Sequence, residues 1–353
     1  MKKDHQVTIK DIARALNIST STVSRAMRNM PDVNQATKKA VLALAEELDY
    51  FPDSIALSLV KKKTNTLGVI VPDLITHFFS SAISGIQEVA AQAGYNVMIA
   101  HSLESFETEK KNVHTLISSR ADGLIISCTV DTQTTEHFQT IVDRGIPLVF
   151  FDRVPEEMEV TKVTIDDHEG ARMAVEHLIK AGYRRIAHIS GPTTLSICRR
   201  RILGYTDTLK AHNIPVEENL IFDSKLKDEN VKEITRALIN SASPPDAILC
   251  VNDLVALVAM IVIKEAGLRI PDDIALIGFG NEPVTSWVHP TLSTINQFPQ
   301  DLGRFAAKEI LDQLANRGQD QISYLPKNLS IKPKLEARGS TMPVSTPLAA
   351  LKR

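Results

Sequence analysis

The sequence predicts a small all-α headpiece, a short hinge helix and an α/β body of two doubly wound subdomains. Apolar residues recur with helical spacing through residues 7–50. From residue 64 onward, short β-branched runs alternate with helical stretches, which is typical of buried parallel strands joined by helices. The predicted strands are Leu67–Val71, Val97–Ala100, Gly123–Ser127, Leu148–Phe151, Val163–Ile165, Ile186–Ser190, Ala247–Val251 and Ile274–Phe279. This alternation restarts near residue 186, which indicates two similar subdomains. We expect a headpiece over 1–52, a hinge helix and linker over 53–65, a two-lobed body over 66–338, and a disordered tail over 339–353.

Three short helices are predicted in the headpiece. The first begins after Thr8, which has the spacing of a capping box with Asp11. The second begins at Ser19 or Thr20, either of which can cap it, and the third begins after Asn34. Apolar side chains that share a helix face are expected to close the core: Ile9, Ile12, Ala13, Leu16, Val23, Ala26, Met27, Val41, Leu44, Ala45 and Leu48.

The second helix has a polar outer face made of Thr20, Ser21, Ser24, Arg25 and Arg28. Short hydroxyls and guanidinium groups near the start of a helix suit reading of the DNA major groove. Arg25 can fork onto guanine O6 and N7, a contact that discriminates between bases by about 1–3 kcal/mol. Three amphipathic helices of any function give a similar pattern, so the pattern alone leaves DNA binding open.

Charge favours the DNA-binding interpretation. Residues 1–63 hold eleven Lys and Arg against seven Asp and Glu, a net charge of +4. The whole chain carries −2, so the remainder carries −6. A basic headpiece on an acidic body is what phosphate contact requires.

The headpiece and hinge resemble those of the LacI/GalR family of bacterial transcription regulators. The resemblance rests on TIKDIARALNISTSTVSRAMRN, then Val33 and Thr37, then a pattern of Tyr50, Pro52, Ala56 and Leu59. The similarity continues through the body to about Arg338. It implies a cytoplasmic, homodimeric regulator, with repression favoured, that binds a near-palindromic double-stranded operator under control of a small-molecule effector.

The resemblance also implies residue roles on DNA. Thr20, Ser21 and Arg25 match the positions that choose the operator, and Leu59 matches a leucine that wedges into the minor groove. Leu57 departs from the family, because many relatives have Arg there; the alternative is that Leu57 and Leu59 are ordinary linker core. The full DNA-binding set expected is Thr8, Ser19, Thr20, Ser21, Thr22, Ser24, Arg25, Arg28, Asn34, Ala56 and Leu59.

The family body resembles periplasmic sugar-binding proteins, with chain crossings between lobes expected near 164–168, 294–298 and 325–329. Ligands in such folds bind beyond the carboxyl ends of strands. The rings of Phe78 and Phe79 can stack on a sugar or base, and Arg201 offers a planar fork to hydroxyls, carboxylate or phosphate. The effector-binding set expected is Phe78, Phe79, Asp152, Arg201, Asn252, Asp253, Asn281 and Gln297.

Several of these assignments have structural alternatives. Asp253 can equally cap the following helix, and Asp152 can pair with Arg153. Three successive arginines at 199–201 are costly near a packed face unless one meets an anion or polyol, which favours a ligand role for Arg201. Many relatives have an acid where Gly280 stands, so Asn281 or Glu282 replaces it or the ligand differs.

An enzyme and an exported solute-binding protein are the rival classes. The sequence has no P-loop, GxGxxG, GxSxG or HExxH motif, and its ten histidines lack metal-ligand spacing, so no cofactor or metal is expected. The first residues, MKKDHQVTIK, lack the apolar core of a signal peptide. We therefore expect a regulator and no membrane partner. A sugar or sugar phosphate is the favoured effector, and a nucleoside or a protein partner remains the alternative.

Overall fold

The computed structural model describes residues 7–50, 63–317 and 325–342. The chain divides into two compact units, Met1–Thr64 and Asn65–Arg353, and each is described by itself. The predicted hinge residues Ala56, Leu57 and Leu59 lie outside the described residues.

The headpiece contains the three predicted helices, α1 (Ile9–Ala15), α2 (Thr20–Met27) and α3 (Gln35–Glu47). Ile12, Val23 and Val41 are fully buried at its centre, where the three helices meet. The helix starts are also as predicted. The Asp11 carboxylate accepts hydrogen bonds from the backbone N–H and hydroxyl of Thr8 at 2.9 and 2.7 Å. Ser19, rather than Thr20, caps α2, and Asn34 caps α3.

Lobe 1 of the body is built on a six-stranded parallel sheet with the strand order β11-β5-β4-β3-β1-β2. Helices α5 and α12 cover one face of this sheet, and α6 and α7 cover the other. Its elements are β1 (Thr66–Val71), α5 (His77–Gln92), β2 (Asn96–His101), α6 (Phe106–Ser118), β3 (Gly123–Ile126), α7 (Glu136–Asp143), β4 (Leu148–Phe151), β5 (Thr161–Ile165), α12 (Pro299–Asn316) and β11 (Asn328–Ile331).

Lobe 2 is built on a second six-stranded sheet, ordered β12-β10-β9-β8-β6-β7, in which only β12 is antiparallel to its neighbour. Helices α8 and α9 cover one face, and α10 and α11 the other. Its elements are α8 (Asp167–Lys180), β6 (Ile186–Ser190), α9 (Ser196–Ala211), η1 (Glu218–Leu220), β7 (Ile221–Asp223), α10 (Asp228–Ile239), β8 (Ala247–Cys250), α11 (Asp253–Glu265), β9 (Ala275–Gly280), η2 (Pro283–Ser286), β10 (Ser293–Asn296), β12 (Lys334–Glu336) and η3 (Gly339–Thr341).

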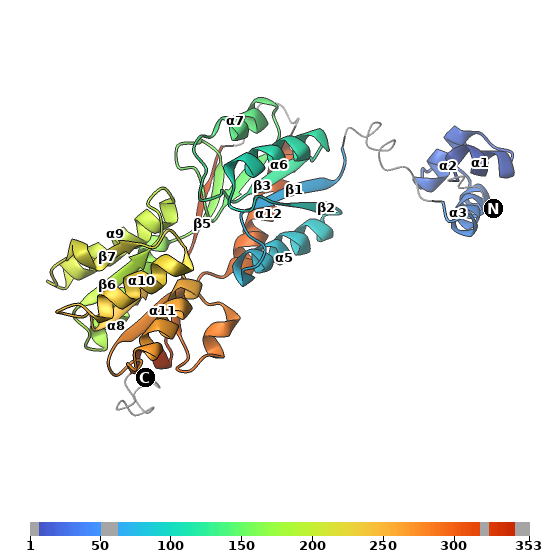
Figure 1. Cartoon of the computed structure of the whole chain (residues 1–353). Coiled ribbons are helices and arrows are strands. Elements are labelled where there is room, and N and C mark those ends of the chain that lie inside the picture. Colours follow the sequence, from blue (N-terminus) through green and yellow to red (C-terminus); the bar gives the residue numbers. More distant parts are fainter. Residues whose placement is uncertain (1–6, 51–62, 318–324, 343–353) are drawn as a thin grey trace. The chain divides into compact units, whose positions relative to one another are not determined.

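The chain crosses between the lobes three times (Figure 1). The first crossing joins β5 to α8 and the second joins β10 to α12, both at the predicted positions. The third joins β11 to β12 at residues 331–334, whereas 325–329 was predicted. The sequence pattern missed β11 because it is a short edge strand with alternating exposed side chains.

The end of the body lies further along the chain than predicted. We expected a disordered tail from residue 339, but Gly339–Thr341 forms the 3-10 helix η3, and Ser340 and Thr341 are fully buried. The Ser340 hydroxyl donates to the Leu276 carbonyl of β9, and Thr341 Oγ1 lies 2.7 Å from His177 Nε2. These polar contacts hold the segment, which has little apolar pattern of its own. Within 7–50, 63–317 and 325–342, no helix has both the length and the apolar character needed to span a bilayer.

Candidate functional site

The outer face of α2 is exposed, as the sequence analysis expected. Thr20, Ser21 and Arg28 are exposed, and the Arg28 Nε donates to the Ser24 carbonyl at 3.1 Å. The guanidinium of Arg25 pairs with Asp32, yet its side chain remains 50% exposed. The helix therefore presents short hydroxyls and a partly neutralised guanidinium to solvent.

The other described residues of the predicted DNA-binding set shape the helix starts. Ser19 Oγ accepts from the Thr22 backbone N–H at 3.0 Å and contacts the Thr22 hydroxyl at 2.8 Å. Asn34 Oδ1 accepts from the Thr37 N–H at 2.7 Å. These caps have a structural function in the free headpiece, and contact with phosphate remains a prediction for them.

A cavity of about 90 Å³, named here the first cavity, lies between the two lobes. Seven of the eight predicted effector-binding residues line it; Asn281 does not. Seven further lining residues were not predicted as part of this set, although Arg153 follows the same strand as Asp152: Thr76, Arg153, Ile197, Leu254, Phe279, Gly280 and Glu282. The complete lining is Thr76, Phe78, Phe79, Asp152, Arg153, Ile197, Arg201, Asn252, Asp253, Leu254, Phe279, Gly280, Glu282 and Gln297.

Two aromatic rings at the start of α5 form the lobe 1 wall. Phe78 and Phe79 meet edge to face with ring centroids 5.1 Å apart. Phe79 is 4% exposed and packs against Phe151 in the lobe core. Phe78 is only half-buried, so it is the ring with a face open to a ligand.

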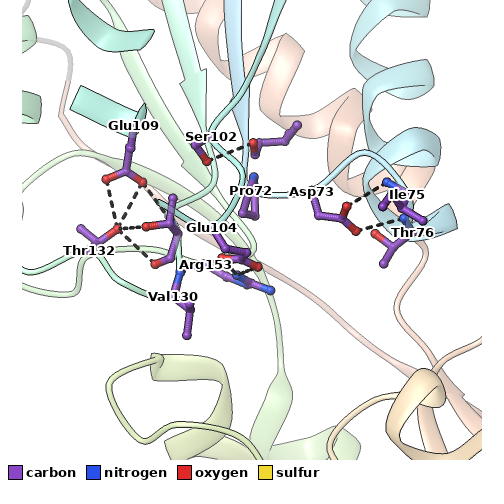
Figure 2. A network of polar contacts seen from close by, with 12 residues as sticks. Pro72, Asp73, Ile75, Thr76, Ser102, Glu104, Glu109, Val130, Thr132 and Arg153 are labelled. Atoms are coloured by element: carbon purple, nitrogen blue, oxygen red, sulfur yellow. Dashed lines mark hydrogen bonds and ion pairs between the residues drawn. The ribbon is translucent and has the colours of Figure 1, made fainter. Parts of the chain in front are cut away.

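Asp152 and Arg153 do not pair with each other. Figure 2 shows that Arg153 binds Glu104, with Nη1 at 2.7 and 2.9 Å from the two carboxylate oxygens. Glu104 follows β2 and has a left-handed backbone conformation (φ 52°). Its Oε2 also accepts the Val130 N–H at 2.8 Å. Lobe 1 thus fixes Arg153 and neutralises its charge.

All three successive arginines meet carboxylates of the protein itself. Arg199 and Arg200 both pair with Glu156, and all three side chains are exposed. Arg201, 4% exposed, binds Asp167 through Nε and Nη2 at 2.9 and 2.7 Å. Its Nη1 donates to the Val251 carbonyl, and its Cζ lies 3.7 Å from the Phe279 ring centroid. Arg201 lines the cavity, but Asp167 already balances its charge, so the prediction that this charge needs a ligand was wrong.

Asp253 is not the helix cap. Asn252 caps α11 by accepting the Val255 N–H at 2.8 Å. Asp253 is 1% exposed and accepts from the Thr294 hydroxyl at 2.6 Å and the Glu282 N–H at 2.8 Å. Burial raises the pKa of Asp253 to about 6, although those two hydrogen bonds oppose the shift.

Two glycines, Gly278 and Gly280, lie directly beside the Asp253 carboxylate. A Cβ at Gly278 would lie 2.2 Å from Asp253 Oδ1, and one at Gly280 would lie 3.1 Å from Asp253 Oδ2. Gly280 also has φ +141°, which L side chains rarely adopt. The Asp253 carboxylate therefore occupies the space beside these glycines and supplies the local negative charge.

Glu282 connects the lobes. Its carboxylate, on lobe 2, accepts the backbone N–H groups of His77 and Phe78 at 3.2 and 3.1 Å, at the start of α5 on lobe 1. A carboxylate at a helix N-terminus is favoured by the helix dipole. The neighbouring Asn281 was predicted wrongly, because its side-chain oxygen accepts from Arg338 Nη2 at 2.6 Å instead of facing the cavity. Arg338 comes from the far C-terminal segment, so no local pattern reveals this contact.

We predict that Asp152→Asn stabilises the body at neutral pH. Burial raises the pKa of Asp152 to about 6, and Arg153 opposes the shift. Because the unfolded value lies near 4, the ionised carboxylate destabilises the fold above about pH 6, and this penalty disappears as pH falls toward 4. Position 152 has φ 58°, which asparagine tolerates.

The measurement is the melting temperature of both proteins between pH 4.5 and 8. Asp152→Asn should melt several degrees higher at pH 7.5 and within about one degree at pH 4.5. A difference that stays constant with pH would contradict the raised pKa.

Among the residues described, no group of three or more His, Cys, Asp or Glu side chains could hold a metal ion. The cavity has instead the character of a binding site: an open aromatic ring, buried acids, neutralised arginines and the amides of Asn252 and Gln297.

Both the headpiece and the body are similar to known protein families. Residues 8–53 match the model of bacterial regulatory proteins of the LacI family, and residues 64–331 match that of periplasmic binding proteins and the sugar-binding domain of the LacI family. The repressor PurR of Photobacterium profundum is 30% identical over 89% of this chain and 94% of its own length. The repressor CytR of Escherichia coli K12 is 33% identical over 89% of this chain and 91% of its own.

Solved structures agree with these matches. The lac repressor dimer bound to operator and the anti-inducer ONPF has a TM-score of 0.85 at 27% identity, covering 96% of this chain and 100% of that one. The regulator CelR in complex with cellobiose has a TM-score of 0.71 at 26% identity, covering 95% and 99%. These relatives are transcription regulators and not enzymes. The chain therefore belongs to the LacI family of bacterial regulatory proteins, as a helix-turn-helix transcriptional repressor with a periplasmic-binding-protein-like effector domain.

Proposed function

We propose that this repressor acts in the bacterial cytoplasm as a homodimer on a near-palindromic operator, and that an uncharged polyhydroxylated molecule, most simply a sugar, controls it. The observation that carries the effector class is the first cavity, which has one open aromatic ring and no unpaired cation. The mechanism is linkage: a ligand that favours one arrangement of the lobes changes operator affinity, and operator changes ligand affinity by the same factor.

DNA reading is assigned to α2. Thr20, Ser21 and Arg25 are exposed there, in the geometry of a recognition helix. The similar lac repressor binds operator as a dimer. A two-fold symmetric dimer reads two related half-sites, which supports a near-palindromic operator. Leu59 and Ala56 remain proposed minor-groove contacts on the basis of the family resemblance alone.

The neutral charge of the effector follows from three occupied positions. A phosphate would seek Arg153, Arg201 or the N-terminus of α5. Glu104 binds Arg153, Asp167 binds Arg201, and Glu282 binds the first amides of α5. A phosphorylated ligand would have to displace one of these carboxylates. This argues against a sugar phosphate, which the sequence alone left open. A nucleoside is also uncharged, so the binding experiment below has to separate it from a sugar.

Binding of sugars, sugar phosphates and nucleosides can be compared by thermal shift and then calorimetry on the full chain. We expect an uncharged sugar to bind, and Phe78→Ala to weaken it about tenfold or more through the lost ring contact. Phe305→Ala is the control, because Phe305 is 43% exposed on α12 and does not line the cavity. Binding of only phosphorylated compounds, or full affinity in Phe78→Ala, would reject the assignment.

Exposed apolar side chains on both lobes support dimerisation. Strand β2 is an edge of its sheet, and Met98 and Ile99 on it are each 40% exposed. On lobe 2, Ile261 of α11 is 55% exposed and Trp287, which follows η2, is 77% exposed. Apolar groups of this size on an edge strand and a helix are typical of a covered surface.

We predict that Trp287→Asp weakens the dimer and lowers operator affinity with it. A buried charge in place of an interface tryptophan typically costs more than 2 kcal/mol, roughly thirtyfold in the dimer dissociation constant. Sedimentation velocity over a concentration series measures this constant. Val142→Asp is the control, since Val142 is 39% exposed on α7 and outside the proposed surface. A variant that remains as dimeric as the parent would remove Trp287 from the interface.

A further inference from the structure

A second cavity of about 110 Å³ shares Arg153 with the first cavity. Lobe 1 contributes residues 128–130, 132–135 and 153–157 to its wall, and lobe 2 contributes residues 194–196 and Arg199. Six of its sixteen lining residues carry a hydroxyl group: Thr129, Thr132, Thr134, Thr135, Thr194 and Ser196. Apart from Arg153, no residue that lines the first cavity lines this one.

Both walls of the second cavity are fixed by the protein. The fully buried Glu109 accepts from the Thr129 N–H at 2.8 Å and from the Thr132 hydroxyl at 3.1 Å. Figure 2 shows this carboxylate beside Thr132, with Glu104 on the Val130 N–H. On lobe 2, Arg199 Nη1 donates to the carbonyls of Thr193 and Thr194 at 2.6 and 3.0 Å. A wall held in this way loses little entropy when a ligand binds.

Hydrogen-bonding groups remain available inside this frame. Among the described residues, the hydroxyls of Thr134, Thr135 and Thr194 have no hydrogen-bond partner, and Thr135 precedes α7 without capping it. The Nε of Arg153 is buried and has no partner either, while Nη1 of the same side chain is held by Glu104. A buried donor without a partner costs free energy unless a ligand or water supplies an acceptor.

The side chains that line the second cavity indicate which kind of ligand group it can bind. It contains no aromatic ring on which a nucleobase could stack. Glu156 and Glu157 line it, and the charge of Arg199 is neutralised by Glu156, so a phosphate is disfavoured. Free hydroxyls with one buried guanidinium N–H suit a group that both donates and accepts several hydrogen bonds, which is a sugar ring.

We propose that the second cavity binds the second ring of a disaccharide whose first ring lies against Phe78 in the first cavity. Arg153 then serves both rings, because it lines both cavities. This inference rests on the proposed control by an uncharged sugar and makes the effector a disaccharide rather than a monosaccharide.

A third cavity of about 240 Å³ adjoins the first through Asp152 and Ile197 and is the rival position for a second ring. It is lined by five charged side chains, Asp152, Glu156, Lys162, Asp167 and Arg200, and offers fewer hydroxyls. Ser330 lines this cavity and is exposed, which makes it a suitable position for a filling variant.

The test is calorimetry on the full chain with maltose, cellobiose and lactose, their component monosaccharides glucose and galactose, and a nucleoside panel. Thr194→Trp fills the second cavity, and Ser330→Trp fills the third. Thr193→Trp is the matched control, because Thr193 is the exposed neighbour of Thr194 and lines neither cavity. We expect a disaccharide to bind about tenfold or more tightly than its monosaccharides, as two or three added hydrogen bonds provide.

In Thr194→Trp, the affinity for the disaccharide should fall to that for the monosaccharide, whose own affinity stays unchanged. Thr193→Trp and Ser330→Trp should bind like the parent. Equal affinity for mono- and disaccharides, or a loss confined to Ser330→Trp, would overturn this inference while leaving the sugar class intact. Binding of nucleosides alone, or of no sugar in the panel, would overturn the proposed effector class and this inference together.

Discussion

Arg201→Ala is expected to lower the free energy of unfolding of the body by about 3–5 kcal/mol, the usual cost of removing one partner of a buried ion pair. The side chains of Arg201 and Asp167 are 5% and 3% exposed, so the variant leaves a carboxylate in the interior without its cation. It also removes the donor to the Val251 carbonyl and the cation above the Phe279 ring. Asp167 begins α8, directly after the first crossing, so the damage reaches the junction of the lobes.

Urea denaturation followed by circular dichroism measures this loss. Arg200→Ala is the matched control, because Arg200 is 55% exposed and its partner Glu156 is exposed as well. Exposed pairs of this kind contribute about 0–1 kcal/mol. Asp167→Asn combined with Arg201→Ala should recover part of the stability, since it removes the unpaired charge. Equal losses in Arg200→Ala and Arg201→Ala would show that burial of the pair has no special weight.

This expectation changes how a lost effector response is interpreted. A body weakened by several kcal/mol can fail to respond because it is partly unfolded, even where the ligand never touches Arg201. Phe78→Ala separates the two causes, because Phe78 is half-buried and makes no hydrogen bond or ion pair through its side chain.

Contacts between residues close together in the chain could be predicted from the sequence. The pairing of Thr8 with Asp11 and the caps of Ser19 and Asn34 each involve residues at most three apart, and the structure contains all of them. Most central strands were predicted correctly because they are continuous buried apolar runs. The central strand β10 was missed, since three of its four residues are Ser, Thr and Asn. The strands β7, β11 and β12 were missed because they are three or four residues long and partly exposed.

The sequence predicted many of the residues that lie at the candidate site, but not which groups of the protein they contact. Side chains after strand ends converge on one cavity, as the topology of parallel sheets requires. Their partners were not readable, because they come from distant segments. Glu282 accepts a hydrogen bond from a backbone amide 204 residues away, and Arg153 binds a carboxylate 49 residues away. The side chain of Asn281 accepts a hydrogen bond from Arg338, which is 57 residues away, and does not line the cavity. The three arginines were misjudged for the same reason: their carboxylates lie 34 to 44 residues away.

On DNA, Arg25→Ala is expected to weaken operator binding by about 1–3 kcal/mol for each half-site, the value of a bidentate arginine–guanine contact. In a symmetric dimer the two losses add to about 2–6 kcal/mol, which gives a reduction of roughly thirtyfold to twenty-five-thousandfold. Arg25 pairs with Asp32 in the free headpiece, but the two side chains are 50% and 39% exposed. Giving up such a pair costs at most about 1 kcal/mol, so base contact outweighs it.

Fluorescence anisotropy on an operator selected from random sequence, and on unrelated DNA, measures both affinities over a range of salt. Arg25→Lys keeps the charge but cannot fork, so it should lose specificity while the salt dependence stays the same. Arg28→Ala is the comparison, since Arg28 is exposed on the same helix and its Nε is held by the Ser24 carbonyl. If Arg25→Ala weakens operator and unrelated DNA by the same factor, Arg25 contacts phosphate, and the choice of operator has to come from Thr20 and Ser21.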